Sequence, residues 1–274
     1  MQTVKQALKS VKDSLKKANI DTWSIDGDLL VAEAAGLTRM QLVTRDDNVL
    51  SEEQEQRLES LLKKRLTHMP MQYILGRCEF MGLMFSVNEN VLIPRPDTEI
   101  LVEKVLEYKP KTVLDIGTGS GAIAVSLAKY GAESVAAVDI SEKALETAAK
   151  NAALNGVDVK FIKSDIFENV SGSFDAIVSN PPYIVRGVIP TLDRQVKDFE
   201  PMLALDGGED GLDFYKVIVS EAKEHLNANG LLAFEIGYDQ GESVSALMRG
   251  AGFKDIEVTK DLAGLDRVVT GIKE

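Results

Sequence analysis

Cysteine and histidine are scarce in this sequence. Its 274 residues include one cysteine, Cys78, and two histidines, His68 and His225. A single cysteine excludes an intrachain disulfide and is typical of a reducing compartment, so we expect a cytoplasmic protein. Cys78 is a poor candidate for a catalytic thiol, neither histidine fits a catalytic triad, and we expect no bound metal.

Long apolar runs are also missing. No stretch approaches the roughly 20 residues that a helix needs to span a bilayer. Residues 1–17 are polar and rich in lysine, without the continuous apolar block of a secretory signal. We therefore expect no membrane partner.

Positive charge is in short supply. The chain has 43 acidic residues against 31 lysines and arginines, which gives a formal net charge of −12. Proteins that grip duplex DNA or RNA usually present a basic face, because phosphate neutralisation supplies most of their affinity. Lys63, Lys64 and Arg65 form only a small cluster, which we interpret as a solvated helix face. We expect no direct nucleic-acid binding.

The amino-terminal part of the chain, up to about residue 80, is expected to be helical, because its apolar residues recur at spacings of three and four. Gly36 is expected to end a second helix. Ser51 and Gln54 form a capping box that begins a third helix reaching Leu66. The apolar positions of the first helix are Val4, Leu8, Val11, Leu15 and Ala18, and those of the third are Leu58, Leu61, Leu62 and Leu66. The pattern predicts a small helical bundle that docks a partner or substrate.

The pattern changes between Cys78 and Pro94. Apolar residues there predict two short strands, with Asn88-Glu89-Asn90 as the turn between them. Prolines then hold the chain extended before a helix over residues 97–108. We expect a substrate-docking domain over 1–77, a hairpin linker over 78–94 and a second domain over 95–274.

Strands and helices alternate after residue 111. The expected strands are residues 112–116, 134–138, 159–162, 174–179, 230–236, 256–260 and 267–272, and the expected helices are 121–129, 143–155, 212–226 and 240–251. Such alternation predicts a largely parallel sheet covered by helices on both faces. The fold class is therefore α/β, with a doubly wound seven-stranded sheet and a small helical bundle joined to it by a β-hairpin.

A glycine-rich turn joins the first of these strands to its helix. It reads Gly117-Thr118-Gly119-Ser120-Gly121. Its glycines allow a tight turn and close approach of the backbone to a ligand. The third glycine falls one position earlier than in the dinucleotide fingerprint, which favours an adenosyl ligand without a pyrophosphate.

Acidic residues follow neighbouring strands at the edge where open parallel sheets bind ligands. Asp139 is placed to accept from both ribose hydroxyls. Asp165 can accept from an adenine amine while Ile166 packs on the purine ring. Asp115 is a further candidate, for an ammonium group on the same ligand.

The segment Asn180-Pro181-Pro182-Tyr183 follows the fourth strand of the sheet. A residue before proline is held extended, and proline has no backbone N–H, so the segment is rich in acceptors. The Asn180 side-chain oxygen and the Pro181 carbonyl can bind both protons of an NH₂ group, and Tyr183 can stack on its plane. The segment predicts methylation of a planar amide or amine nitrogen, with no general base required before transfer.

Several stretches together resemble one family. They are Pro70–Gly76 with Glu79-Phe80, Pro94–Glu99, Gly117–Ala124, Ser179–Ile184 and Glu200–Leu212 with Tyr215. The chain resembles the class I methyltransferases that modify amino groups of planar substrates. It is most similar to the peptide chain release factor glutamine N5-methyltransferases, over nearly its whole length.

This resemblance implies S-adenosylmethionine as methyl donor, a methyltransferase domain over 95–274, and the Gly-Gly-Gln glutamine of class 1 release factors as substrate. It implies that Gly117–Gly121, Asp139, Ile166 and Asn180 contact the donor and that Asn180–Tyr183 hold the glutamine amide. Phe80 would lie against the substrate, although it can equally be a hydrophobic joint residue. Arg95, Thr98 and Glu99 would approach the methionine end. Ile166 departs from the tryptophan common at that position.

Three other interpretations remain open. A sister family methylates a glutamine of ribosomal protein L3 and has nearly the same donor domain. The same segment could hold an adenine N6 amine of DNA after base flipping, although the net charge disfavours this. A donor-binding adaptor without activity is disfavoured by the intact Asn180–Tyr183 segment.

Overall fold

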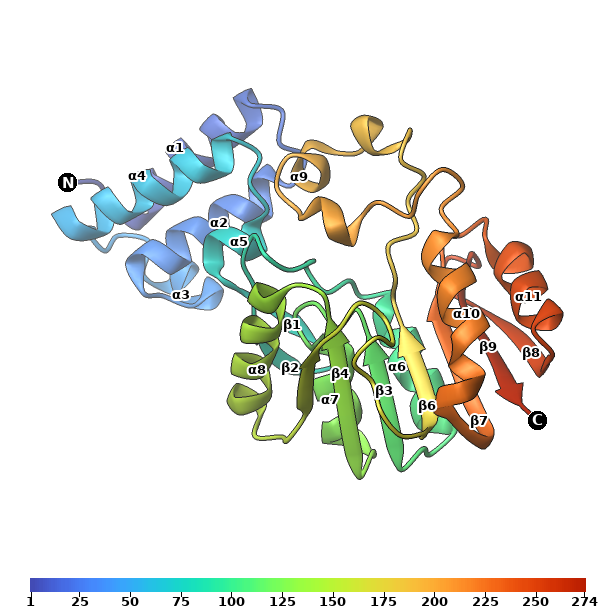
Figure 1. Cartoon of the computed structure of the whole chain (residues 1–274). Helices are drawn as coiled ribbons and strands as arrows, with labels where there is room; N and C mark the ends of the chain where they lie inside the picture. The colour runs from blue at the N-terminus through green and yellow to red at the C-terminus, as the bar shows by residue number, and fades with distance from the viewer. The chain divides into compact units, whose positions relative to one another are not determined.

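The computed structural model describes all 274 residues, which divide into two compact units. One unit comprises Met1–Gly76 together with Arg194–Phe199, and the other comprises Arg77–Asp193 together with Glu200–Glu274. Figure 1 colours the first 76 residues in blues and the sheet of the second unit from green to red. The membership of residues 194–199 in the helical unit has no signal in the local sequence.

The first unit is entirely helical. Its helices are α1 (Val4–Lys17), α2 (Trp23–Ala35), α3 (Arg39–Thr44), α4 (Glu52–Leu66), α5 (Met71–Leu75) and the short α9 (Arg194–Lys197). The predicted capping box of Ser51 and Gln54 begins α4, and the predicted stop at Gly36 is confirmed, because this glycine adopts the left-handed conformation after α2. Apolar faces of α1, α2 and α4 form one core.

The expectation that Arg65 lies on a solvated face is wrong. Its side chain is 1% exposed, and its Nε donates to Asp26 Oδ2 at 2.7 Å. Its other nitrogens donate to the Met69 carbonyl and the Thr22 hydroxyl. Leu66, expected to be buried, is 37% exposed. The helix buries a cation here because a carboxylate from α2 compensates it.

The predicted hairpin is confirmed, but its predicted turn is wrong. The strands are β1 (Arg77–Phe80) and β2 (Leu83–Ser86), and Phe80 pairs with Leu83 across a two-residue turn at Met81-Gly82. Both turn residues have positive φ, as the tightest hairpin turns require. Asn88 instead accepts from the Asn90 backbone N–H at 2.9 Å, which makes a side-chain turn after β2.

The second unit contains the predicted seven-stranded sheet (Figure 1). Its strands are β3 (Thr112–Ile116), β4 (Ser134–Asp139), β5 (Lys160–Lys163), β6 (Phe174–Ser179), β7 (Leu226–Glu235), β8 (Phe253–Lys260) and β9 (Asp266–Lys273). The order is β5-β4-β3-β6-β7-β9-β8, with β9 antiparallel to both of its neighbours and the other pairs parallel. The chain reverses its direction of growth between β3 and β6, and open sheets bind ligands at such a point.

Helices cover both faces of this sheet. They are α6 (Thr98–Glu107), α7 (Ala122–Tyr130), α8 (Glu142–Asn155), α10 (Asp213–His225) and α11 (Gly241–Gly250), and two 3₁₀ turns lie at Ile189–Thr191 and Met202–Ala204. Successive strand residues point to opposite faces, so Val113 joins the core under α6 and α7 while Leu114 joins the core under α10 and α11. This two-sided burial explains the continuous apolar character of the central strands.

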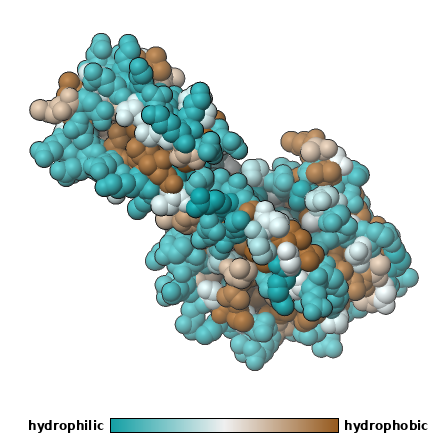
Figure 2. Space-filling model, turned by 90° about the horizontal axis from the view of Figure 1, so that it is seen from above, coloured by the Kyte–Doolittle hydropathy of each residue, from teal (hydrophilic) through white to brown (hydrophobic).

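The surface seen in Figure 2 is largely hydrophilic, with hydrophobic residues gathered in small separate patches. Among the exposed apolar residues are Met202 and Leu203, which lie in the second 3₁₀ turn. No helix combines the length and the apolar character needed to cross a bilayer.

Candidate functional site

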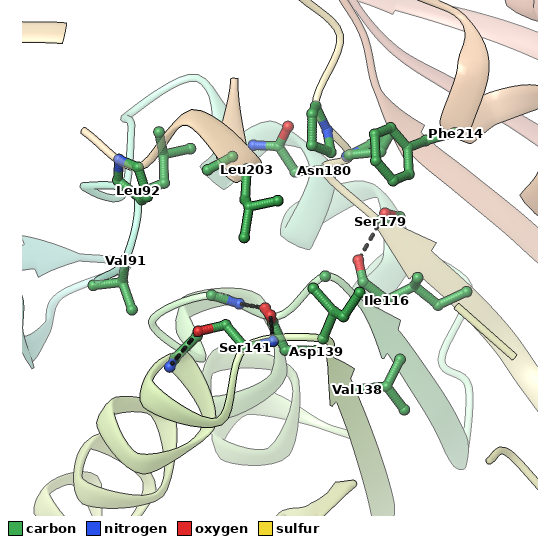
Figure 3. Close-up of a pocket in the computed structure, with 18 of the residues that line it drawn as sticks. Val91, Leu92, Ile116, Val138, Asp139, Ser141, Ser179, Asn180, Leu203 and Phe214 are labelled. Carbon is green, nitrogen blue, oxygen red and sulfur yellow. Dashed lines mark hydrogen bonds between the residues drawn. The ribbon is translucent and has the colours of Figure 1, made fainter. Parts of the chain in front are cut away.

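A pocket of about 450 Å³ lies at the carboxyl ends of β3, β4, β5 and β6. This volume is in the range of small-molecule sites. Figure 3 shows residues from consecutive strand ends converging on it, among them Ile116, Asp139 and Asn180. The pocket therefore occupies the sheet edge at which the sequence predicts a ligand.

The pocket brings together many of the predicted site residues. Those that line it are Gly117, Gly119, Asp139, Asp165, Ile166, Asn180, Pro181 and Pro182. Thr118, Ser120 and Gly121 belong to the same glycine turn but do not line the pocket, and Tyr183 lies just beyond its wall. The glycine turn and the proline segment thus form two parts of one site.

The glycine turn owes its shape to backbone conformations that favour glycine. Gly117, Gly119 and Gly121 have φ of 72°, 55° and 81°. A Cβ on Gly121 would lie 3.0 Å from the Cβ of Ala148, so this glycine also lets α7 approach α8 closely. The backbone N–H groups of Gly117 and Thr118 both donate to the Val138 carbonyl, which ties the turn to β4.

Asp139 is held by the backbone on both of its oxygens. The Gly119 N–H donates to Oδ2 at 2.9 Å, and the Ser141 N–H donates to Oδ1 at 2.8 Å (Figure 3). Burial raises the pKa of this carboxyl. Each oxygen of a carboxylate has two lone pairs, so each can still accept from a ligand hydroxyl. The arrangement suits two neighbouring hydroxyls such as those of a ribose.

The charge of the lining residues distinguishes between classes of ligand. Glu89, Asp139 and Asp165 bring carboxylates to the pocket, and no lysine, arginine or histidine lines it. A phosphate or pyrophosphate would meet no cation here. An adenosyl ligand with a positive sulfonium and ammonium fits this set, and Val138, Ile140 and Ile166 supply apolar surface for a purine.

Asp115 is fully buried in β3 and is hydrogen-bonded to the glycine turn. Its Oδ2 accepts from the Thr118 hydroxyl at 2.6 Å, while Oδ1 has no hydrogen-bond partner. Burial raises the pKa of this carboxyl to about 7. It does not line the pocket, so its predicted contact with an ammonium group would have to run through an intervening group.

The Asn180 side chain is oriented by the start of α6. Its Nδ2 donates to the Thr98 hydroxyl oxygen at 3.4 Å. The amide nitrogen is therefore hydrogen-bonded within the protein, and the amide oxygen remains available to accept from a ligand. Pro181 and Pro182 have no N–H, so their part of the pocket wall presents carbonyl oxygens only.

Tyr183 is held in place from two sides. Its carbonyl accepts from Gln240 Nε2 at 3.2 Å, and Gly207 lies so close that a Cβ there would be 2.7 Å from the Tyr183 Cα. Its side chain packs against the core under α10 and α11, and burial raises its pKa to about 12. A neutral ring in this position can pack or stack, so the predicted stacking role stays a prediction.

Four other residues highlighted by the sequence lie outside the pocket lining. Phe80 is 1% exposed and packs edge-to-face on Phe85 in the core under α6 and α7. Arg95 is paired with Glu200, Glu99 accepts from the Met81 N–H, and Thr98 contacts Asn180. Among these, only Thr98 is tied directly to a lining residue by a hydrogen bond.

Sequence reasoning missed part of the lining. The pocket is also lined by residues 89–92, by Ser141 at the start of α8, and by Leu203 and Phe214, which approach it from different sides (Figure 3). The prediction of a hairpin turn at Asn88-Glu89-Asn90 gives residues 89–92 no part in a ligand site. Ser141 carried a usable signal, since it is an N-cap residue two positions after Asp139.

Two family models match this chain, one in its amino-terminal helical part and one in the part that contains the sheet. The family model "Methyltransferase small domain" matches residues 95–195, and "PrmC N-terminal domain" matches residues 6–76. Two relatives named release factor glutamine methyltransferase come from Agrobacterium fabrum and Caulobacter vibrioides. They are 41% and 43% identical to this chain over 98% and 99% of its length, and 96% of each relative is covered. A methyltransferase structure from Pyrococcus furiosus matches 80% of this chain and 98% of its own, with a TM-score of 0.55 and 21% identity, which supports the fold.

Proposed function

The chain belongs to the release factor glutamine methyltransferase family, and we propose that it methylates the side-chain N5 of the Gly-Gly-Gln glutamine in class 1 peptide chain release factors. The observation that carries this is the Asn180-Pro181-Pro182-Tyr183 segment at the end of β6, beside a pocket that has carboxylates and no basic side chain. Such a site suits a cationic adenosyl donor next to a nitrogen nucleophile.

S-adenosylmethionine supplies an electrophilic methyl group on a positively charged sulfur. In our assignment Gly117 and Gly119 lie against the donor, and Thr118, Ser120 and Gly121 keep the turn in shape. Asp139 accepts from the two ribose hydroxyls. Asp165 accepts from the adenine amine, Ile166 packs on its ring, and Asn180 lies near the methionine part.

The glutamine amide is held by acceptors. Asn180 Oδ1 and the Pro181 carbonyl accept from its two N–H groups, while Pro182 and Tyr183 lie against the planar amide. An amide nitrogen is a weak nucleophile because its lone pair is delocalised. Acceptors on both protons stabilise the positive charge that grows on nitrogen during transfer, and orientation lowers the barrier further. The bond between the methyl carbon and the donor sulfur would break as the bond to the amide nitrogen forms. The nitrogen would then lose a proton to water, so no base is needed before transfer.

We assign residues 1–77 to docking of the release factor, 78–94 to the linker and 95–274 to methyl transfer. The expected setting is the cytoplasm, where release factors act, with no nucleic acid bound directly. The net charge of −12 favours a protein substrate over DNA.

Labelled donor tests this proposal directly. The chain is incubated with purified release factor, ribosomal protein L3 or DNA, and label is expected on the release factor alone. A release factor whose motif glutamine is alanine is the control and should stay unlabelled. Label on L3 or DNA instead would contradict the proposed substrate.

Asn180→Ala tests the proposed chemistry. The variant loses an acceptor that matters most in the transition state, so turnover should fall by about 100-fold or more while the donor affinity changes little. Single-turnover rates and calorimetric binding of S-adenosylhomocysteine separate the two effects. Nearly unchanged turnover would refute the role assigned to Asn180.

A further inference from the structure

Glu235 is a buried carboxylate that the proposed chemistry does not use. It ends β7, is 2% exposed, and its Oε2 has no hydrogen-bond partner. A buried carboxylate without full compensation is costly and therefore calls for a reason. Its position suggests one, because Glu235 neighbours Asn180, a residue of the pocket lining, where β7 and β6 end together.

The pairing of Ser179 with Phe234 brings Glu235 next to Asn180 at the ends of β7 and β6. The Glu235 carboxylate interacts with the side chains of Thr98 and Asn180. Asn180 Nδ2 in turn donates to the Thr98 hydroxyl oxygen at 3.4 Å. Three side chains from β7, α6 and the end of β6 thus share one small polar network inside the second unit.

The direction of donation in this network follows from the chemistry of its members. An ionised carboxylate only accepts, so the Thr98 O–H donates to Glu235. The Thr98 oxygen is then an acceptor toward Asn180, which must turn its NH₂ inward. The Asn180 Oδ1 consequently points away from Glu235 and is free for a substrate N–H.

We propose that Glu235 is a positioning residue, which acts through Thr98 to fix the Asn180 amide with its oxygen toward the nitrogen to be methylated. This inference rests on the proposed function, since it concerns the acceptor that holds the substrate amide. Both orientations of an asparagine side chain have nearly the same shape, so packing alone does not choose between them. An ionised carboxylate does select one orientation, because it can only accept hydrogen bonds and so requires the NH₂ group to face inward.

Protonation of Glu235 removes this constraint. The groups facing it are Arg267 from β9, Asp97 at the start of α6, Tyr183 after β6 and Tyr215 from α10. Arg267 is shared with Asp97 and Asp261, at 3.4 and 3.0 Å, so it compensates Glu235 only in part. Burial raises the pKa of Glu235 to about 7. Below that pH a carboxylic O–H can donate to Thr98, whose hydroxyl can then donate to Asn180 Oδ1 and turn the acceptor inward.

Glu235→Gln tests the inference, because glutamine has the same shape but carries a donor as well as an acceptor. We expect its kcat for release factor methylation at pH 8 to fall at least about 10-fold, with the dissociation constant of S-adenosylhomocysteine within about 2-fold of wild type. The wild-type kcat should rise between pH 6 and 8, and the variant should lack this rise. Glu257→Gln, an exposed change on β8, is the control and should match wild type.

Thr98 provides an independent arm if Glu235→Gln does not fold. Thr98→Ser keeps the hydroxyl and should retain activity, whereas Thr98→Val should lose at least about 10-fold in kcat. An unchanged kcat in Glu235→Gln, a variant that keeps the wild-type pH profile, or equal activities of the two Thr98 variants would overturn the inference. A wild-type protein that does not label the release factor contradicts the proposed function instead, so the two failures are distinguishable.

Discussion

Replacing Asp139 by asparagine should weaken donor binding through both its backbone and its ligand contacts. In the wild type, Gly119 and Ser141 each donate to a different oxygen of this carboxylate. Asparagine keeps one oxygen as an acceptor, while its NH₂ group faces a backbone N–H. The change therefore removes the charge, one of the two backbone hydrogen bonds that hold the side chain, and one of the two acceptors proposed for the ribose.

The size of the effect follows from the hydrogen bonds at stake. A hydrogen bond to a charged group contributes about 1.5–3 kcal/mol. Asp139→Asn loses one such bond to the ligand and weakens the other, so a loss of about 3 kcal/mol is expected. This corresponds to a rise of roughly 150-fold in the dissociation constant of the donor or its product. Asp165→Asn keeps an acceptor for the adenine amine and should cost only about 10-fold.

Isothermal titration with S-adenosylhomocysteine measures both variants, and thermal melting without ligand checks that they fold. Since burial raises the pKa of Asp139, wild-type affinity should fall as the pH is lowered through that raised value. Asp139→Asn should lack this fall. A dissociation constant within about 3-fold of wild type, in a folded variant, would refute the role assigned to Asp139.

Two further predictions concern stability. Asp26→Ala leaves the buried Arg65 without its carboxylate partner and should lower the free energy of unfolding by about 3–5 kcal/mol, measured by urea denaturation. Replacing both residues by leucine should recover most of this loss. A loss below about 1 kcal/mol for Asp26→Ala would contradict the stabilising role of the ion pair. Burial raises the pKa of Asp115 from 3.8 to about 7, so the folded protein binds this proton more tightly than the unfolded chain does. Binding of this proton therefore stabilises the folded state fully below about pH 4, and the stabilisation is lost as the pH rises through about 7. The melting temperature of the wild type should decline over this pH range, and Asp115→Asn should flatten the decline. An equal decline in both proteins would contradict this role of Asp115.

Local patterns in the sequence determined most of the secondary structure. Apolar periodicity and turn residues act over a few neighbours, so the seven strands, the capped helix after Ser51 and the stop at Gly36 could be predicted. The order of strands and helices also placed the glycine turn and the proline segment at one edge of the sheet, because parallel strands end together.

The tertiary structure alone decided which side chains meet. Arg65 is buried because Asp26 faces it from another helix, and Phe80 is in a core because Phe85 packs on it. Glu235 lies far from Asn180 in the sequence, and only the pairing of β6 with β7 brings their ends together. A residue's partner depends on contacts across the whole fold, which local periodicity does not encode. The sequence thus named the groups that suit methyl transfer, and the fold determined what orients them.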